Sequence, residues 1–232
     1  MLKKMLERIK RKNRNYIKTA ADNSKTRIRK NLDENIKIFR EILGESSDVI
    51  LRKIKIGGTN AAVLYLEGLA DNEVVNDFIL KPLLLDVRQT KPSGKLAPKE
   101  LFLKIKENSV PIGEISEAED FDKLVSLFLT GVSAVLVDGF PKALMLNTKG
   151  WEKRSITDPD IEKVIKGPRD GFTETLRVNT TLVRRRLRDP NLRVINLQIG
   201  RRSKTDVAVI YIEDIANPDL VKEVKKRLEK MT

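Results

Sequence analysis

Residues 132–146, VSAVLVDGFPKALML, place two apolar runs on either side of Asp138-Gly139. An Asp-Gly pair accepts the positive φ angles of a tight turn, so these runs predict a β-hairpin. The apolar runs 49–56 and 61–66, joined by a Gly-Gly-Thr-Asn turn, predict a second hairpin. Helical patterns lie between such strands along the chain. This mixture favours an α/β (or α+β) fold.

Amphipathic periodicity and capping residues predict the helices. Leu32, Ile36, Phe39 and Leu43 recur at helical spacing, and Gly44 is expected to end this helix. Asp71 suits the start of a second helix, and Pro82 is expected to end it.

Further along the chain, Ser116 and Glu119 match a capping box and predict a helix beginning at residue 116. Asn217 precedes a final amphipathic helix, and its side chain is of the type that caps a helix start.

Positive charge is concentrated at the N-terminus. The net charge is +13, and residues 1–30 contain twelve Lys or Arg against two acidic residues. The other 202 residues contain 34 basic and 31 acidic side chains. Residues 1–30 also have few large apolar groups with which to offset the entropy of ordering, so we predict a disordered basic tail. Because the rest is nearly balanced, nucleic-acid binding is not favoured.

The sequence contains neither His nor Cys. This excludes Ser-His-Asp triads, Cys-His pairs and zinc sites built on those side chains. Carboxylate pairs, a Ser-Lys dyad or a magnesium site remain open, but no spacing of acidic residues singles one out. We therefore expect a non-catalytic module without cofactor or metal. No stretch approaches the roughly 20 apolar residues of a membrane-spanning helix.

Two segments of the chain look alike. IKIG at 54–57 resembles LQIG at 197–200, and YLE at 65–67 resembles YIE at 211–213. Each unit is expected to be a hairpin followed by a capped helix. Its second strand is continuously apolar, which predicts a strand covered on both faces. Internal duplication and convergence of two ordinary hairpin-helix units both explain the likeness.

We predict two small subdomains of mixed β-sheet packed by α-helices, with residues 31–109 in the first and 110–232 in the second. Trp151 follows the Asp138-Gly139 hairpin. It is expected either to line a ligand pocket or, as is more common for a lone Trp, to pack between the subdomains.

The most distinctive stretch is GPRDGFTE at 167–174, a turn that leads into a helix over about 173–188. Asp170 or Thr173 is expected to cap this helix. Phe172 and Asn179 fall on its apolar face, while Arg177, Arg184 and Arg188 form a separate basic stripe.

Several residues of this stretch are candidates for contacts. Arg169, Asp170 and Glu174 form either an interaction site or a local capping and ion-pair network. Asn179 binds a ligand or partner, or hydrogen-bonds nearby backbone. Arg184 contacts phosphate or an acidic partner, or belongs to a solvated helix end.

On these residues the chain resembles a known family. The motif at 167–174, the following Asn179-Thr180 and the Arg triplet at 184–186 are similar to the A subunit of GerA-type spore germinant receptors of endospore-forming bacteria. The segments 131–139 and 207–212 agree as well. The resemblance covers roughly residues 40–232 and matches the N-terminal domain of that subunit.

The resemblance implies a biological setting. The A subunit is a membrane protein, and its soluble N-terminal domain precedes the transmembrane helices on the cytoplasmic (spore-core) side of the spore inner membrane. Its partners are B- and C-type subunits, and the complex responds to small nutrients. We therefore expect a role in germinant sensing, signal transduction or receptor assembly during spore germination.

Alternatives stay open at this point. A nutrient binds in a cleft between the subdomains, or the domain only relays a signal or scaffolds assembly. The basic tail contacts anionic lipid, or simply keeps the protein soluble. A nucleic-acid-binding or scaffold module with a basic tail is the rival function.

Overall fold

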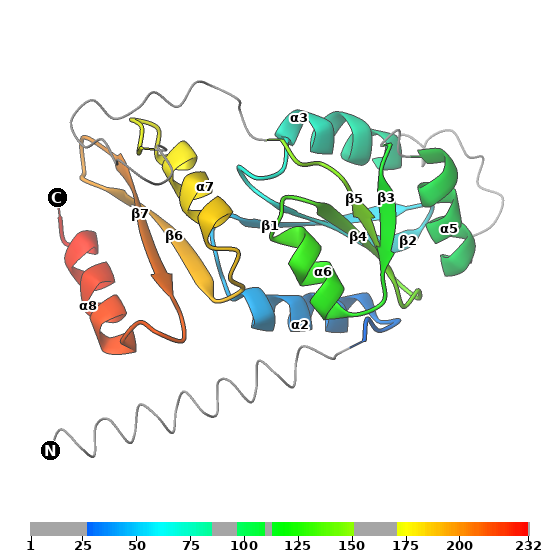
Figure 1. Ribbon diagram of the computed structural model, residues 1–232, viewed down its shortest axis with the longest axis horizontal. Helices are drawn as coiled ribbons and strands as arrows, with labels where there is room; N and C mark the ends of the chain where they lie inside the picture. The colour runs from blue at the N-terminus through cyan, green and yellow to red at the C-terminus, as the bar shows by residue number, and fades with distance from the viewer. Residues whose placement is uncertain (1–26, 85–96, 110–112, 151–170, 232) are drawn as a thin grey trace, which may run out of the picture.

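The computed structural model describes residues 27–84, 97–109, 113–150 and 171–231, which form two units (Figure 1). The N-terminal unit is built on a five-stranded sheet of order β1-β2-β4-β5-β3, and the C-terminal unit on the hairpin β6-β7. The strands are β1 Val49–Ile56, β2 Thr59–Leu66, β3 Ile115–Ala118, β4 Ser133–Val137, β5 Ala143–Leu146, β6 Leu192–Ile199 and β7 Thr205–Ile212. The predicted fold class is confirmed. All pairings between these strands are antiparallel. The prediction of mixed sheets, with both parallel and antiparallel strands, is therefore wrong.

Helices cover both faces of the five-stranded sheet (Figure 1). They are α2 Leu32–Leu43, α3 Asn72–Val74 continued by the π-helix η1 Val75–Leu80, α5 Pro98–Lys104 continued by the π-helix η2 Ile105–Ser109, and α6 Phe121–Phe128. Alternating residues of β2 serve the two faces. Leu64 and Leu66 pack in the cluster under α2 and α6, whereas Ala61 and Val63 belong to the cluster under η1 and α5.

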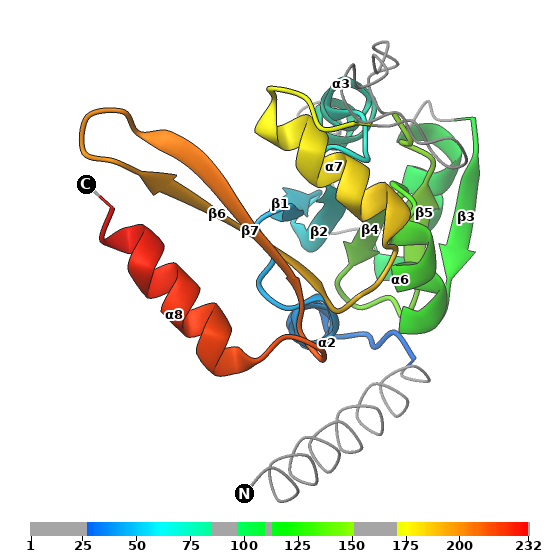
Figure 2. The same cartoon turned by 60° about the vertical axis from the view of Figure 1, so that its left-hand side comes forward.

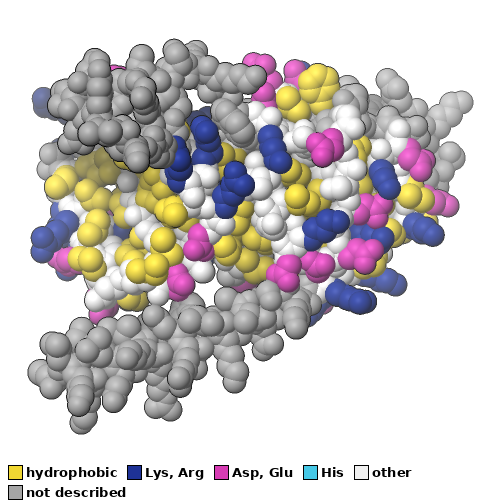
Figure 3. Space-filling model, in the orientation of Figure 1, with side chains coloured by type: hydrophobic (Ala, Val, Ile, Leu, Met, Phe, Trp, Pro, Cys, Tyr) yellow, Lys and Arg dark blue, Asp and Glu magenta, His cyan; other side chains and the backbone are white. Residues whose placement is uncertain are grey.

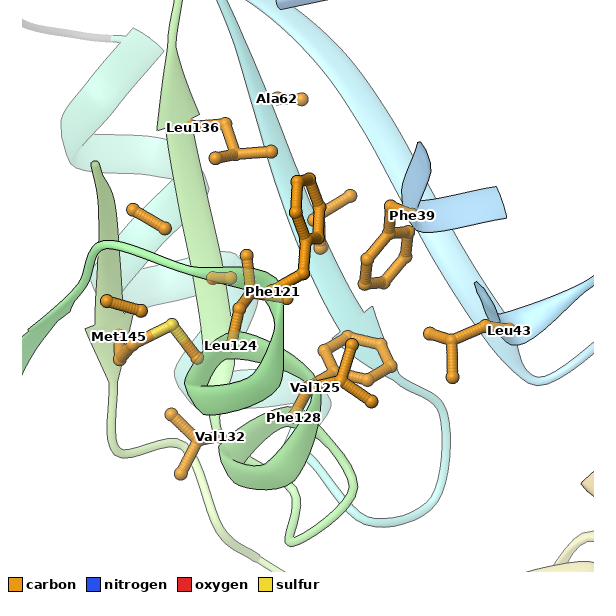
Figure 4. Close-up of a cluster of buried hydrophobic side chains, with 14 of the residues drawn as sticks. Phe39, Leu43, Ala62, Phe121, Leu124, Val125, Phe128, Val132, Leu136 and Met145 are labelled. Atoms are coloured by element: carbon orange, nitrogen blue, oxygen red, sulfur yellow. The ribbon is translucent and has the colours of Figure 1, made fainter. Parts of the chain in front are cut away.

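The cluster under α2 and α6 is rich in aromatic rings (Figure 4). Phe39 of α2 meets Phe128 of α6 edge to face, with ring centroids 5.1 Å apart. Both rings are fully buried. The stripe predicted from residues 32–43 is therefore confirmed as the buried face of α2, and each such side chain contributes about 1.5–3 kcal/mol by leaving water.

The helix that begins after Asp71 does not end at Pro82 as predicted. The Asp71 carboxylate caps it by accepting the backbone N–H of Glu73 at 2.8 Å, and the helix runs on through Leu84. A proline ring normally collides with the carbonyl four residues earlier. Here the preceding turns are π-type, with the Lys81 N–H bonded to the Asn76 carbonyl. A widened turn displaces the carbonyls that the ring would meet.

The capping-box prediction at residue 116 is also wrong. Residues 115–118 form β3, where Ser116 pairs with Met145 of β5. The helix starts later, at Phe121, and the Asp120 carboxylate caps it by accepting the Lys123 N–H at 2.8 Å. Pairing with a neighbouring strand outweighs a local capping pattern that only nearby residues support.

The five-stranded sheet extends across residue 110. Ala61 of β2 pairs with Val137 of β4, so the predicted boundary near residue 110 falls inside the N-terminal unit.

The fold begins earlier than residue 31, where the predicted disordered tail was expected to end. Ile28 is buried and its N–H bonds to the Glu119 carbonyl at 2.9 Å. Residues 27–30 therefore belong to the fold, while the rest of the predicted tail lies outside the described residues.

The C-terminal unit consists of α7 Leu176–Arg186, the β6-β7 hairpin and α8 Pro218–Glu229. In both views α8 lies on the outer side of the hairpin, away from the five-stranded sheet (Figures 1 and 2). Asn217 caps α8 as predicted, accepting the Asp219 N–H at 2.9 Å.

The prediction that β7 is covered on both faces is wrong, since none of its residues is buried. β2 lies between β1 and β4, whereas β7 pairs with β6 alone. The two hairpins do share strands of eight residues and a capped helix, so both explanations of the repeat remain open.

Candidate functional site: a polar joint between the two units

Buried polar groups gather where the two units meet, beside three buried apolar side chains of the C-terminal unit, Leu182, Leu192 and Val194. Neither of the two apolar core clusters includes a residue after Leu146. By contrast, five of the nine buried polar or charged side chains among the described residues lie at this joint. They are Ser46, Asp48, Thr181, Arg184 and Arg193.

Arg184 of α7 is the centre of the joint. It is 1% exposed, and its Nε and Nη2 donate to the two carboxylate oxygens of Asp48 at 2.9 and 3.0 Å. Nη2 also reaches the Ser46 hydroxyl at 3.1 Å, and that hydroxyl donates to Asp48 at 2.6 Å. A buried charge is tolerated only when it is paired and hydrogen-bonded, and this bidentate geometry meets both conditions.

The loop that carries Asp48 also binds the outer edge of β6. The Ser47 N–H donates to the Val194 carbonyl at 2.7 Å, and the Val194 N–H donates to the Ser46 hydroxyl at 2.9 Å. The Asn196 N–H adds a bond to the Ser47 hydroxyl at 3.1 Å. One loop of the N-terminal unit therefore holds both α7 and β6.

A second arginine closes the joint beside Gly44. Arg193 Nη1 donates to the Pro190 carbonyl at 2.6 Å, and Nε lies 3.8 Å from the Glu213 carboxylate. Burial lowers the pKa of the Arg193 guanidinium. Gly44 has φ +64°, and a Cβ there would collide with this guanidinium. The joint thus requires a residue without a side chain at position 44.

Helix α7 approaches the N-terminal unit at two further points. Arg177, whose side chain is 61% exposed, forms a 2.9 Å ion pair with the partly buried Glu67. Gly68, at φ +88°, lies so close to Thr181 that a Cβ would collide with the threonine hydroxyl.

The predicted basic stripe of α7 is split in the structure. Arg184 is buried in the joint, so this residue is not part of a solvated helix end, whereas Arg177 is exposed and pairs with Glu67, and Arg188 is exposed beyond the end of the helix. Phe172, which was placed on the apolar face, is 75% exposed. The reason is that Asp48 and Glu67 supply counter-charges from the other unit, which the periodicity of one helix does not reveal.

Asn179 has a local role. Its side chain accepts the Thr173 N–H and donates to the Thr173 carbonyl, both at 2.7 Å. It therefore fixes the turn before α7, and the expected cap by Asp170 or Thr173 is replaced by Thr175, whose side chain makes no capping bond. Glu174 is exposed. Trp151, Arg169 and Asp170 lie outside the described residues, so their predicted contacts stay predictions.

Sequence reasoning missed Ser46, Asp48, Thr181 and Arg193. The first two lie in a short polar loop that looks like any connection between a helix and a strand. No motif marks them, because their partner Arg184 is 136 residues or more away.

Described residues of the N-terminal unit line at least two open pockets. One of about 470 Å³ lies at β3 and α6, where Glu117 accepts hydrogen bonds from Lys106 at 2.7 Å and Lys142 at 3.1 Å. Those bonds lower the pKa of the Glu117 carboxyl. The other, of about 570 Å³, is lined by Lys30, Asn31, Gly58, Thr59, Asn60, Ala97, Pro98, Asp138 and Gly139.

Acidic side chains do not gather into a metal-binding group anywhere in the described ranges. Among the helices that the structure describes, none has the length and apolar character needed to cross a membrane.

Residues 37–232 match the family model described as Bacillus/Clostridium GerA spore germination protein. The chain belongs to this family. It is 36% identical over 203 residues to spore germination protein KA of Bacillus subtilis strain 168, a match that covers 86% of the chain and 36% of that relative. It is 34% identical over 201 residues to spore germination protein GerLA of Bacillus cereus, covering 86% of the chain and 39% of the relative.

A solved structure shares the GerA fold of this chain. The N-terminal domain of the A subunit of the Bacillus megaterium spore germinant receptor GerK3 superimposes with a TM-score of 0.66 at 30% identity. The match covers 89% of this chain and 74% of that one. The family expected from the motifs is therefore confirmed. The chain spans less than two-fifths of the length of the two curated relatives described above.

Proposed function

We propose that this chain acts as the N-terminal domain of a germinant-receptor A subunit and relays a conformational signal between its two units through the polar joint. The observation that carries the proposal is the buried Arg184–Asp48 pair, which links α7 to the loop before β1. No catalytic step is part of this function.

The physical argument rests on how the two units are held. Each apolar cluster is confined to the N-terminal unit, so moving the C-terminal unit would not require either core to be repacked. A bidentate pair has a strong geometric preference, since its hydrogen bonds are lost when the groups shift. Joints of this kind suit rigid-body movements of one unit against another.

The relatives support the wider setting of the proposal. Their names are those of spore germination proteins, and the matched structure comes from a germinant-receptor A subunit. We place this domain on the core side of the spore inner membrane, in a complex with B- and C-type subunits that responds to a small nutrient. The exposed Phe172 and Glu174, together with Arg169 and Asp170, are the proposed contacts with those partners.

The test uses spores that carry the full-length receptor subunit to which this domain belongs. Arg184→Lys keeps the positive charge but cannot reproduce the bidentate geometry. Arg177→Lys is the matched control, because its ion pair with Glu67 joins the same units at a more exposed position. The measurements are the rate of nutrient-induced germination, the amount of receptor subunit and the co-purification of its partner subunits.

We expect Arg184→Lys to slow germination at least tenfold with normal subunit levels and assembly, and Arg177→Lys to leave germination unchanged. Loss of assembly along with germination would support a scaffold instead of a relay. Normal germination with Arg184→Lys would contradict both. If the lysine variant fails to accumulate, Ser46→Ala removes only the hydroxyl that joins Arg184 to Val194 and repeats the test.

A further inference from the structure

The balance of charge over residues 31–232 conceals two units of opposite sign. Residues 31–170 contain 20 basic and 23 acidic side chains, a net charge of −3. Residues 171–232 contain 14 basic and 8 acidic side chains, a net charge of +6. The basic character of the protein is therefore shared between residues 1–30 and the C-terminal unit.

Part of this charge gathers at one end of the C-terminal unit. Arg201, Arg202 and Lys204 are exposed in the turn between β6 and β7. Helix α8 returns alongside the hairpin, so that its C-terminal end lies on the side of this turn in both views (Figures 1 and 2). Dark-blue side chains are visible at this end of the molecule in Figure 3. None of the three basic residues in the turn forms an ion pair with any residue that the structure describes.

Helix α8 adds exposed apolar side chains to the basic end of the C-terminal unit. No residue of α8 is buried, and Leu220 and Met231 are 63% and 59% exposed. Leu220 lies in the first turn of α8, whereas Met231 follows the helix, two residues after its end at Glu229. Arg227 falls on the same side of α8 as Leu220, seven positions later, and forms a 2.9 Å ion pair with Glu223. The C-terminal unit therefore exposes apolar side chains at both ends of α8, next to basic ones.

We propose that the β6–β7 turn, together with the exposed Leu220 of α8 and Met231 just after it, forms a surface that binds an anionic lipid bilayer. Amphipathic helices at membrane interfaces combine these features, with apolar side chains entering the acyl boundary and basic ones facing the headgroups. The phosphates of a nucleic acid would pair with the arginines of the turn, but a nucleic acid offers no apolar phase for Leu220 and Met231. An anionic bilayer is thus the partner that would contact both the basic and the apolar side chains. The proposed binding surface is separate from the basic tail at residues 1–30.

The experiment measures binding of the full chain to phosphatidylcholine vesicles with and without phosphatidylserine. The variant R201E/R202E reverses two charges in the turn. The control K37E/K55E makes the same change in net charge at exposed positions of α2 and β1 in the N-terminal unit. All of these proteins keep residues 1–30, so any contribution of the basic tail is the same in each.

At about 1 kcal/mol for each basic residue near an anionic surface, losing two arginines alone weakens binding to the phosphatidylserine vesicles about thirtyfold, and the two new negative charges should weaken it further. K37E/K55E should weaken it by less than about threefold, because distant exposed charges are screened. The apolar variant L220S/M231S should weaken binding too, with the salt dependence unchanged.

Three outcomes would overturn the proposal. Equal weakening by both charge variants would indicate attraction by net charge alone. Unaltered vesicle binding by R201E/R202E would assign the lipid contact to another part of the chain. Loss of duplex-DNA binding by R201E/R202E, with vesicle binding intact, would identify a nucleic-acid surface. Each outcome is independent of the polar joint, since these residues lie outside it.

Discussion

Arg184 and Asp48 form a buried bidentate ion pair although 136 positions separate them in the sequence. The pair connects the helix that follows the GPRDGFTE motif to the loop between α2 and β1. Much of the buried contact between the two units depends on this pair and on the Ser46 hydroxyl beside it.

Replacing Arg184 by Met should destabilise the protein by about 3–5 kcal/mol, because it leaves the Asp48 carboxylate buried without a counter-charge. The free energy of unfolding in urea measures this. Arg177→Ala removes an exposed pair and should cost no more than about 1 kcal/mol. The double variant Arg184→Met/Asp48→Leu should regain part of the loss, and similar costs for Arg184→Met and Arg177→Ala would show that the buried pair contributes little.

The contact between Gly68 and Thr181 can be tested against a second glycine. Gly68→Ala and Gly58→Ala both place a side chain at positive φ, +88° and +82°, which costs about 1–2 kcal/mol. A Cβ at Gly58 meets no atom within 4 Å, whereas one at Gly68 collides with Thr181. Thermal unfolding should show the larger loss for Gly68→Ala, with partial recovery in Gly68→Ala/Thr181→Ala. Equal losses would mean that the joint relaxes freely around position 68.

Acid should weaken the fold partly through Glu117. Hydrogen bonds from Lys106 and Lys142 lower the pKa of its carboxyl below the usual 4.5. Its contribution to stability is therefore fully present above the unfolded-state pKa and is lost as the pH falls through the lower folded-state pKa. Chemical denaturation at a series of pH values should show a shallower acid loss for Glu117→Gln than for the unchanged protein. Parallel curves would contradict this assignment.

Two phenylalanines should behave in opposite ways. Phe39 is fully buried against Phe128, so Phe39→Ala should cost about 3–5 kcal/mol through lost burial and the cavity left behind. Phe172 is 75% exposed, and Phe172→Ala should change the free energy of unfolding by less than about 0.5 kcal/mol. A large cost for Phe172→Ala in the isolated chain would show that it packs within the domain, which argues against a role in partner contact.

Local features of the fold were predictable because their causes lie close together in the sequence. The stripe from Leu32 to Leu43 defines α2, and Asp138-Gly139 defines the β4–β5 hairpin. Asp71 and Asn217 cap their helices as expected. The motifs near Gly167 and Gly131 led to the family whose model matches residues 37–232.

The predictions that failed depended on distant partners. The pairing of β2 with β4 joins residues on both sides of the predicted boundary, and the pairing of β3 with β5 replaces a helix start at Ser116. Pro82 remains inside a helix because η1 widens the preceding turns.

The sequence by itself determined the hairpins, the helices capped by Asp71 and Asn217, and the family. Only the tertiary structure decided that Arg184 points inward and that β7 and α8 stay partly uncovered. Amphipathic periodicity predicts that an arginine faces solvent. Arg184 is buried instead because the interior of the protein contains a carboxylate that pairs with it. That carboxylate, Asp48, is contributed by a loop whose position depends on the packing of the whole N-terminal unit.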